Sequence, residues 1–283
     1  MKYSAKELIL KRKSVRTYDG RGIREEDLRK LEEYLQSLDN PFGVPVEFRL
    51  LDKKEFGLSS PVILGEEIYL AAKVRKTVNF EIAYGYSFEK ACLYALSLGL
   101  GTVMLAASLS RSAFEKAMEV KEGEVMPAAS PVGYPAEKRS IRKNLMRKGL
   151  KADERLPFED TFFSGSFERG LKKEEAGEYK EALAMAALAP SAGNKQPWRA
   201  VADNERVHFY EHRSLKESPL GDIQKVDVGI FLCHFETVLK EQGIKGAFVS
   251  SDPGIALPSD TRYIISFERR NGWTADFHRR YIC

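Results

Sequence analysis

The segment APSAGNKQPW, residues 189–198, follows an alanine-rich helical pattern and precedes a segment with the character of a strand. Pro190 ends the helix, because its ring clashes with the preceding turn. The small residues after it let a flat ligand approach the backbone. Asn194 and Gln196 carry amide groups that can read a ring edge bearing carbonyl oxygens and nitrogens. A helix end with a Ser/Asn turn would use the same residue types.

The second half of the chain around this segment alternates helical and extended patterns. We expect a helix over 178–191, a strand over 206–212, a buried helix over 228–246 and a strand with a turn over 262–272. The mixture is typical of an α+β protein.

The first half shows the same mixture. Four leucines at helical spacing predict an amphipathic helix over 24–38, and alternation predicts a strand over 46–52. An irregular region follows. We then expect a buried helix over 88–101, closed by glycines, and a strand with a turn over 123–135.

The order of elements therefore restarts in mid-chain. Three pairs of similar positions are each 144 residues apart, namely Gly85 and Gly229, Gly99 and Gly243, and Leu100 and Ile244. Asp52 and Asp203 close comparable strands at a separation of 151. A near-constant shift predicts an internal duplication, with repeats at 1–155 and 156–283 that are not independent. An unrelated α+β protein can also show this order twice by chance.

A basic motif, KRKSVRTYD, occupies residues 11–19. Arg12, Lys13 and Arg16 surround the hydroxyl of Ser14, so the motif can give a phosphate charge-assisted hydrogen bonds. A solvated basic patch at the end of a helix is the alternative.

Two further stretches are weaker evidence for a ligand-binding site. GLGTVMLAAS, residues 99–108, contains GxG but ends a helix, whereas a dinucleotide fingerprint opens one, so tight packing remains an alternative to a ligand contact. The basic stretch 137–151, with Lys138 and Arg139, could complete a phosphate site, bind nucleic acid or be solvated.

Composition sets the broad class. The 283 residues are 43% hydrophobic and 30% charged, which is typical of a globular protein, and a net charge of +4 does not by itself indicate nucleic acid. The N-terminus lacks the order of a secretory signal, and no apolar run is long enough to span a membrane. A cytoplasmic protein without a membrane partner is expected.

Neither metal chemistry nor a protein nucleophile is indicated. Cys92, Cys233 and Cys283 are far apart and match no zinc or disulfide spacing. The chain also lacks GxSxG, HExxH and Walker motifs. Any chemistry is therefore expected to belong to a bound cofactor.

Taken together, the motifs resemble the FMN-dependent nitroreductase family. RKSVRTY (12–18) resembles its phosphate signature, APSAGNKQPW its flavin-ring loop, and GLGT (99–102) with VGYP (132–135) its C-terminal half. The resemblance implies an α+β fold with antiparallel-rich sheets covered by helices. Members of this family are usually homodimers with FMN at the interface.

The resemblance also implies a set of FMN-binding residues. They comprise phosphate and ribityl contacts at Arg12, Lys13, Ser14 and Arg16, ring contacts at Leu105, Ala106, Pro190, Ser191, Ala192, Asn194 and Gln196, and closure of the phosphate site by Lys138 or Arg139.

The chain departs from the family pattern in one respect. DNPFGVPVEF (39–48) stands where the first repeat should carry a ring loop, and SFERGLKKEEAG (166–177) stands where the second should carry a phosphate signature. Each repeat thus keeps one half-site. We expect one FMN per chain in a pseudo-dimeric monomer, and further dimerisation stays open.

The function implied is an FMN-dependent NAD(P)H oxidoreductase that reduces nitroaromatic or quinone-type acceptors by a ping-pong mechanism. NADH or NADPH would be the donor, and a small molecule the acceptor. The alternative is a non-catalytic module that binds FMN or another nucleotide as a sensor or carrier. Nucleic-acid binding through 137–151 is a further alternative, although no nucleic-acid partner is expected.

Overall fold

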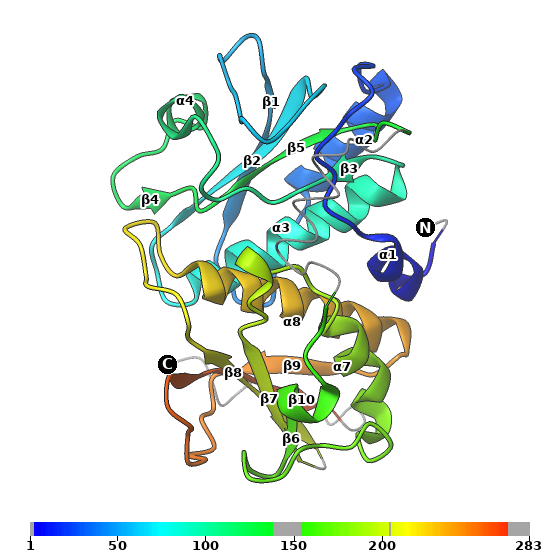
Figure 1. Ribbon diagram of the computed structural model, residues 1–283, viewed down its shortest axis with the longest axis vertical. Coiled ribbons are helices and arrows are strands. Elements are labelled where there is room, and N and C mark those ends of the chain that lie inside the picture. Colours follow the sequence, from blue (N-terminus) through cyan, green and yellow to red (C-terminus); the bar gives the residue numbers. More distant parts are fainter. Residues whose placement is uncertain (1–2, 138–153, 204, 271–283) are drawn as a thin grey trace.

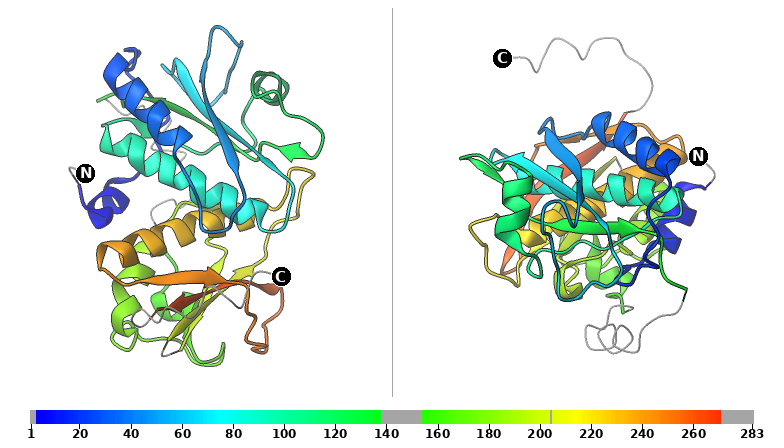
Figure 2. Two further views of the ribbon diagram at one scale, coloured as in Figure 1. Left: turned by 180° about the vertical axis from the view of Figure 1, so that it is seen from behind. Right: turned by 90° about the horizontal axis from the view of Figure 1, so that it is seen from above.

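The computed structural model describes residues 3–137, 154–203 and 205–270. Two five-stranded sheets lie at opposite ends of the molecule, with two long helices side by side between them (Figure 1). These helices are α3, Phe80–Ser97, and α8, Ile223–Glu241. The view from behind shows the same order of sheet, helix, helix and sheet (Figure 2). The fold is α+β with antiparallel-rich sheets, as expected.

The first half of the chain supplies one sheet. Its other elements are α1 (Ala5–Lys11), α2 (Glu25–Gln36), α4 (Arg111–Ala117), β1 (Val46–Asp52), β2 (Ile68–Arg75), β3 (Gly101–Thr102), β4 (Glu124–Val125) and β5 (Ala129–Gly133). The predicted strand 46–52 is confirmed, and the predicted helix 24–38 exists as α2. Strand β2 lies in the region that the sequence analysis described as irregular. The strand was missed because both of its faces are buried, so its sequence does not alternate between polar and apolar residues.

The second half supplies the other sheet. Its elements besides α8 are α6 (Phe158–Thr161), β6 (Phe162–Ser164), the 3₁₀ turn η1 (Gly177–Tyr179), α7 (Lys180–Ala186), the 3₁₀ turn η2 (Ala192–Asn194), β7 (Trp198–Ala202), β8 (Arg206–His212), β9 (Gly246–Val249) and β10 (Thr261–Arg269). The predicted strand 206–212 is confirmed. The helix expected over 178–191 is shorter, since it ends at Ala186 and Pro190 cannot extend it.

Both long helices begin earlier than the sequence predicted. α3 starts at Phe80, where 88 was expected, and α8 starts at Ile223, where 228 was expected. Nearly every position of both helices is buried, so no polar face marks their first turns. The side chain of Asp222 caps α8 by accepting from the backbone N–H of Gln224 at 2.9 Å.

The two sheets share one strand order. In the first sheet the order is β1-β2-β5-β3, and in the second it is β7-β8-β10-β9. All of these neighbours are antiparallel. The first sheet adds β4 beside β2, and the second adds β6 in parallel at the β7 edge. Each sheet is therefore built from one half of the chain with one connectivity.

The core lies where the long helices meet each other and the sheets. Each helix is covered on one side by a sheet and on the other by the partner helix, which explains burial around its whole circumference. At the crossing each helix carries a glycine, Gly85 on α3 and Gly229 on α8. Within the described part of the chain, none of the helices is both long and apolar enough to pass through a bilayer.

Candidate functional site

Four distant segments line a single cavity of about 370 Å³. They are the basic segment 12–16, the segment 103–108, the 190–194 loop and one face of α8. Arg155 and Leu188 complete the wall. The cavity thus joins the basic motif to the APSAGNKQPW motif, although 176 positions separate Ser14 from Pro190.

The basic segment is held in an extended conformation beside β3. Val15 is buried, and its N–H donates to the carbonyl oxygen of Thr102 at 2.9 Å. A Cβ at Gly101 would lie 2.6 Å from the side chain of Val15, so the segment packs tightly on β3. With Val15 anchored, the four predicted phosphate contacts all lie on the cavity wall, namely Arg12, Lys13, Ser14 and Arg16.

Arg12 has a second partner behind the wall. Its Nε donates to Oε1 of Glu89 on α3 at 2.8 Å, and Nε2 of His234 on α8 lies 2.9 Å from the same oxygen. Burial by itself raises the pKa of Glu89, but Arg12 and His234 outweigh it, so the pKa is below the usual range. Glu89 is therefore ionised, and Arg12 is fixed between α1 and both long helices.

The 190–194 loop has an unusual backbone. Gly193 has φ 58°, Asn194 has φ 55° and Gln196 has φ 48°, so three of four consecutive residues are left-handed. This conformation is costly for most residues other than glycine, asparagine less so, and strained backbone of this kind clusters at functional sites. Ser191 supports it, because its hydroxyl oxygen accepts from the N–H of Gln196 at 2.9 Å.

The amide side chains of this loop have protein partners. Nδ2 of Asn194 donates to the carbonyl oxygen of Glu154 at 3.1 Å, and Oε1 of Gln196 accepts from the N–H of Leu156 at 3.0 Å. Gln196 is buried and is not among the residues that line the cavity. The structure thus places the amide of Gln196 against the segment 154–156 and outside the cavity lining, and its contact with a ring edge stays a prediction. Sequence alone did not indicate this segment.

The remaining predicted residues divide into two groups. Leu105 and Ala106 line the cavity together with Pro190, Ser191, Ala192 and Asn194. Leu105 is fixed by two backbone hydrogen bonds with Ala129, at 2.8 and 3.0 Å. Lys138 and Arg139 lie outside the described residues.

The structure adds residues that the sequence analysis missed. Ile223, Asp227 and Ile230 face the cavity from α8, and Arg155 reaches it from beside the loop. Their spacing of four and three places the α8 residues on one helix face. A single acidic residue in the apolar run VDVGIFLCHF was the available signal.

Asp227 ties the loop to α8. Its Oδ2 accepts from the backbone N–H of Ala192 at 3.0 Å, and the residue is 3% exposed. Burial raises the pKa of Asp227 well above its usual range, and the hydrogen bond from Ala192 only partly opposes this, while Asp222 and Glu211 raise it further. Its neutral form is therefore favoured up to a higher pH than in an exposed aspartate.

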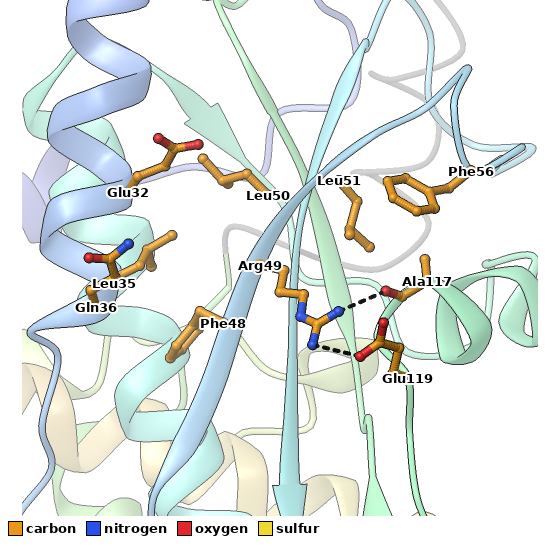
Figure 3. A pocket seen from close by; sticks show the side chains of 10 residues that line it. All are labelled: Glu32, Leu35, Gln36, Phe48, Arg49, Leu50, Leu51, Phe56, Ala117 and Glu119. Carbon is orange, nitrogen blue, oxygen red and sulfur yellow. Dashed lines mark hydrogen bonds and ion pairs between the residues drawn. The ribbon is translucent and has the colours of Figure 1, made fainter.

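A second hollow of similar volume lies elsewhere, between α2, β1 and the end of α4. Figure 3 shows Arg49 pointing from β1 toward Ala117 and Glu119. Arg49 donates to the carbonyl oxygen of Ala117 at 3.4 Å and to the carboxylate of Glu119 at 3.1 Å. Its cation is thus neutralised within the wall, and this hollow shares no lining residue with the cavity that joins the motifs.

Comparisons with known proteins agree with the fold. A putative nitroreductase from Thermotoga maritima MSB8 has a TM-score of 0.62 at 20% identity, with 94% of each chain covered. A putative NADH dehydrogenase/NAD(P)H nitroreductase from Bacteroides thetaiotaomicron VPI-5482 has a TM-score of 0.40 at 23% identity, covering 48% of this chain and 89% of its own. An FMN-dependent nitroreductase from Clostridium difficile R20291 has a TM-score of 0.39 at 16% identity, covering 50% and 94%.

The first of these likenesses shows a nitroreductase-like α+β fold. No curated protein matches the chain. A family model described as "Putative TM nitroreductase" matches residues 4–238, which is most of the chain. The chain therefore belongs to this nitroreductase family.

Proposed function

We propose that this protein binds FMN in the cavity and is an NAD(P)H oxidoreductase that reduces nitroaromatic or quinone-type acceptors by a ping-pong mechanism. One observation carries the proposal. The basic segment 12–16 and the 190–194 loop line the same cavity, together with the segment 103–108. A ligand with an anionic end and a flat end suits this combination.

The basic end of the cavity fits a phosphate. Lys13 and Arg16 offer cationic donors, and Ser14 adds a hydroxyl. Arg12 adds a guanidinium whose orientation is fixed by its ion pair with Glu89. These residues would hold the phosphate group of FMN, and their positive charge would favour its dianionic form.

The other end fits a flat apolar ring. Pro190, Ala192 and Gly193 have short side chains, so the wall stays low. Ile223 and Ile230 provide an apolar surface on α8. Such a wall would orient a ring and exclude water from one side of it, while leaving room for a second ring to stack.

The bound cofactor would carry out the redox chemistry. When bound, FMN supplies the ability to accept a hydride from a nicotinamide and to pass electrons on to an acceptor. The protein's own residues would bind the phosphate, orient the ring and keep the reacting face dry. A donor and an acceptor that use the same face in turn would give a ping-pong rate law.

We further propose that the chain is an internal duplication, with repeats at 1–155 and 156–283, that holds one FMN. Support comes from the shared strand order of the two sheets and from paired positions 144 residues apart. Ile230 lines the cavity, whereas Tyr86, 144 positions earlier, is buried. The ring of Tyr86 packs edge-on against Phe42 at 5.6 Å between centroids, so aromatic side chains fill the related location.

The proposal is tested by spectroscopy of the purified full chain. We expect a flavin absorbance spectrum, either as isolated or after reconstitution with FMN, that bleaches when NADH or NADPH is added anaerobically. Addition of a nitroaromatic compound or a quinone should restore it. Retained FMN with no reduction by either nicotinamide would favour a sensor or carrier, and no FMN binding would overturn the proposal.

A further inference from the structure

A buried carboxyl group lies on the cavity wall beside the 190–194 loop. Asp227 occupies one face of α8 with Ile223 and Ile230, so its carboxyl group is flanked by apolar side chains on that face. It is 3% exposed, and Oδ2 accepts from the N–H of Ala192 at 3.0 Å. Among the described residues no cation forms an ion pair with Asp227, and a carboxyl group buried in this way favours its neutral form.

The charged groups around Asp227 agree with a neutral acid. Asp222, at the start of α8, and Glu211, on β8, raise its pKa further beyond the effect of burial. The cations on the same cavity wall are Arg12, Lys13, Arg16 and Arg155. The pKa of Asp227 is raised in their presence. A neutral carboxylic acid has an O–H donor that a carboxylate lacks.

The amide groups near Asp227 already have hydrogen-bond partners within the protein. Nδ2 of Asn194 donates to the carbonyl oxygen of Glu154 at 3.1 Å, and Nε2 of Gln196 donates to the carbonyl oxygens of Glu154 and Asn194, each at 3.4 Å. The N–H of Ala192 is already used by Asp227. The carboxylic acid of Asp227 is a further donor adjacent to this part of the wall.

We propose that Asp227 recognises the ring of the ligand in this cavity, by donating a hydrogen bond from its neutral acid to a ring nitrogen or carbonyl oxygen while Oδ2 accepts from Ala192. The inference rests on the proposed function, in which the ligand is FMN. It assigns ring recognition to a residue of α8 that lies outside both sequence motifs.

The sign of the pH dependence separates this role from a purely structural one. As the pH rises through the pKa of Asp227, the acid loses its donor and the carboxylate repels an electron-rich ring edge. FMN affinity should then fall. If Asp227 only held the loop, ionisation would strengthen its acceptance from Ala192 and affinity would not fall, because charged acceptors make stronger hydrogen bonds.

The experiment is a titration of the full chain with FMN, followed by quenching of flavin fluorescence, from neutral to mildly alkaline pH. Asp227→Asn is the matched variant, since its amide can accept from Ala192 and donate to the ring at every pH. Asp227→Leu removes both capacities at similar volume. The FMN phosphate ionises equally in all three titrations, so the ratio of dissociation constants isolates Asp227.

We expect the wild-type protein and Asp227→Asn to bind FMN within a few-fold of each other at neutral pH. The wild-type protein should then lose up to about tenfold in affinity per pH unit relative to the Asn variant. Asp227→Leu should bind about tenfold more weakly than Asn at neutral pH. Circular dichroism checks folding, and if the Leu variant fails to fold, the wild-type and Asn comparison stands by itself.

A readout without FMN completes the test. The carbon-13 chemical shift of the Asp227 carboxyl group in the apo protein, assigned through Asp227→Asn, should report the protonated form at neutral pH. An ionised carboxyl group there, or a wild-type to Asn ratio that is constant with pH, overturns the inference and leaves the proposed function intact. Failure of the wild-type protein to bind FMN at any pH overturns both.

Discussion

Gly85 on α3 lies directly against Val226 on α8, where an added Cβ would come within 1.9 Å of the carbonyl oxygen of Val226. The contact has a counterpart, because a Cβ at Gly229 would come within 2.3 Å of the carbonyl oxygen of Ile82. Both members of the second pair are related to the first by 144 positions. Such reciprocity is the pattern of a two-fold interface between equivalent surfaces.

This crossing should be sensitive to a single methyl group. Gly85→Ala and Gly229→Ala should each lower the free energy of unfolding by at least about 2 kcal/mol, because the obstructing atoms are backbone and the helices must separate. Urea unfolding measures the loss. Gly22→Ala is the control, since its nearest neighbour is a side-chain oxygen at 3.8 Å. Equal unfolding midpoints for the Gly85 and Gly22 variants would contradict the packing.

Arg16 should contribute to FMN affinity through the phosphate. Arg16→Ala should weaken FMN binding by about 2 kcal/mol, or roughly thirtyfold, because a charge-assisted hydrogen bond is lost. Fluorescence titration measures the dissociation constant. Arg21→Ala is the control, as Arg21 is exposed and pairs with Asp19 away from the cavity. Equal affinity of the two variants would remove Arg16 from the phosphate site.

The buried carboxylate of Glu89 should make stability depend on pH. Glu89→Gln leaves Arg12 without its ion pair and should lower the free energy of unfolding by about 3 kcal/mol at neutral pH. Since the folded pKa of Glu89 is lowered, this contribution is present above the usual glutamate pKa, about 4.3, and is lost as the pH falls through the folded value.

Urea unfolding of the wild-type protein and Glu89→Gln at neutral and acid pH tests this. The gap between them should shrink in acid. Glu33→Gln serves as the control, because Glu33 forms an exposed pair with Arg29. A gap that stays constant down to the acid limit of folding would show that Glu89 is not ionised.

Because the backbone of Asn194 is left-handed, a glycine at this position should be more stable than an alanine, the reverse of the usual order of stability. Both Asn194→Ala and Asn194→Gly lose the bond to Glu154, but alanine is also strained at φ 55°. We expect the alanine variant to be less stable than the glycine variant by about 1 kcal/mol in urea unfolding. An alanine variant that is as stable as the glycine variant would mean that the loop relaxes to another conformation at little cost.

Flavin stoichiometry tests the single-site proposal. Saturation of the full chain should require one FMN per chain, because Tyr86, 144 positions before Ile230 of the cavity wall, is buried and packs against the ring of Phe42. Equilibrium dialysis with absorbance of the released flavin gives the ratio. A value near two would refute the idea of complementary half-sites.

The sequence analysis succeeded where neighbours along the chain set the pattern. The strands 46–52 and 206–212 were predicted with their observed ends. Prediction failed for β2 and for the first turns of α3 and α8, because burial on all sides removes the polar positions that mark a period. The amphipathic helix α2, with one exposed face, was easier to recognise.

The cavity shows the same contrast between features that local sequence indicates and features that depend on distant residues. Local chemistry singled out the basic segment 12–16 and the 190–194 loop, and the structure lines one cavity with both. It placed the end of α7 too late, because the helix ends at Ala186 and not at 191. It did not suffice for Gln196, because the partner that binds its amide is Leu156, 40 positions earlier. Local chemistry also did not indicate Asp227, because the hydrogen bond that it accepts from Ala192, 35 positions earlier, forms only in the folded chain.

The sequence by itself determined the residue types that can hold an anion and lie beneath a flat ring, together with the proline that keeps α7 from continuing into the loop. These properties depend on side-chain chemistry and on backbone preferences over a few residues. Only the tertiary structure decided that Arg12 is fixed by Glu89, that Asp227 of α8 is buried on the cavity wall and that the loop's amides bind the 154–156 segment. Burial and pairing arise from packing between distant elements, which no local pattern encodes.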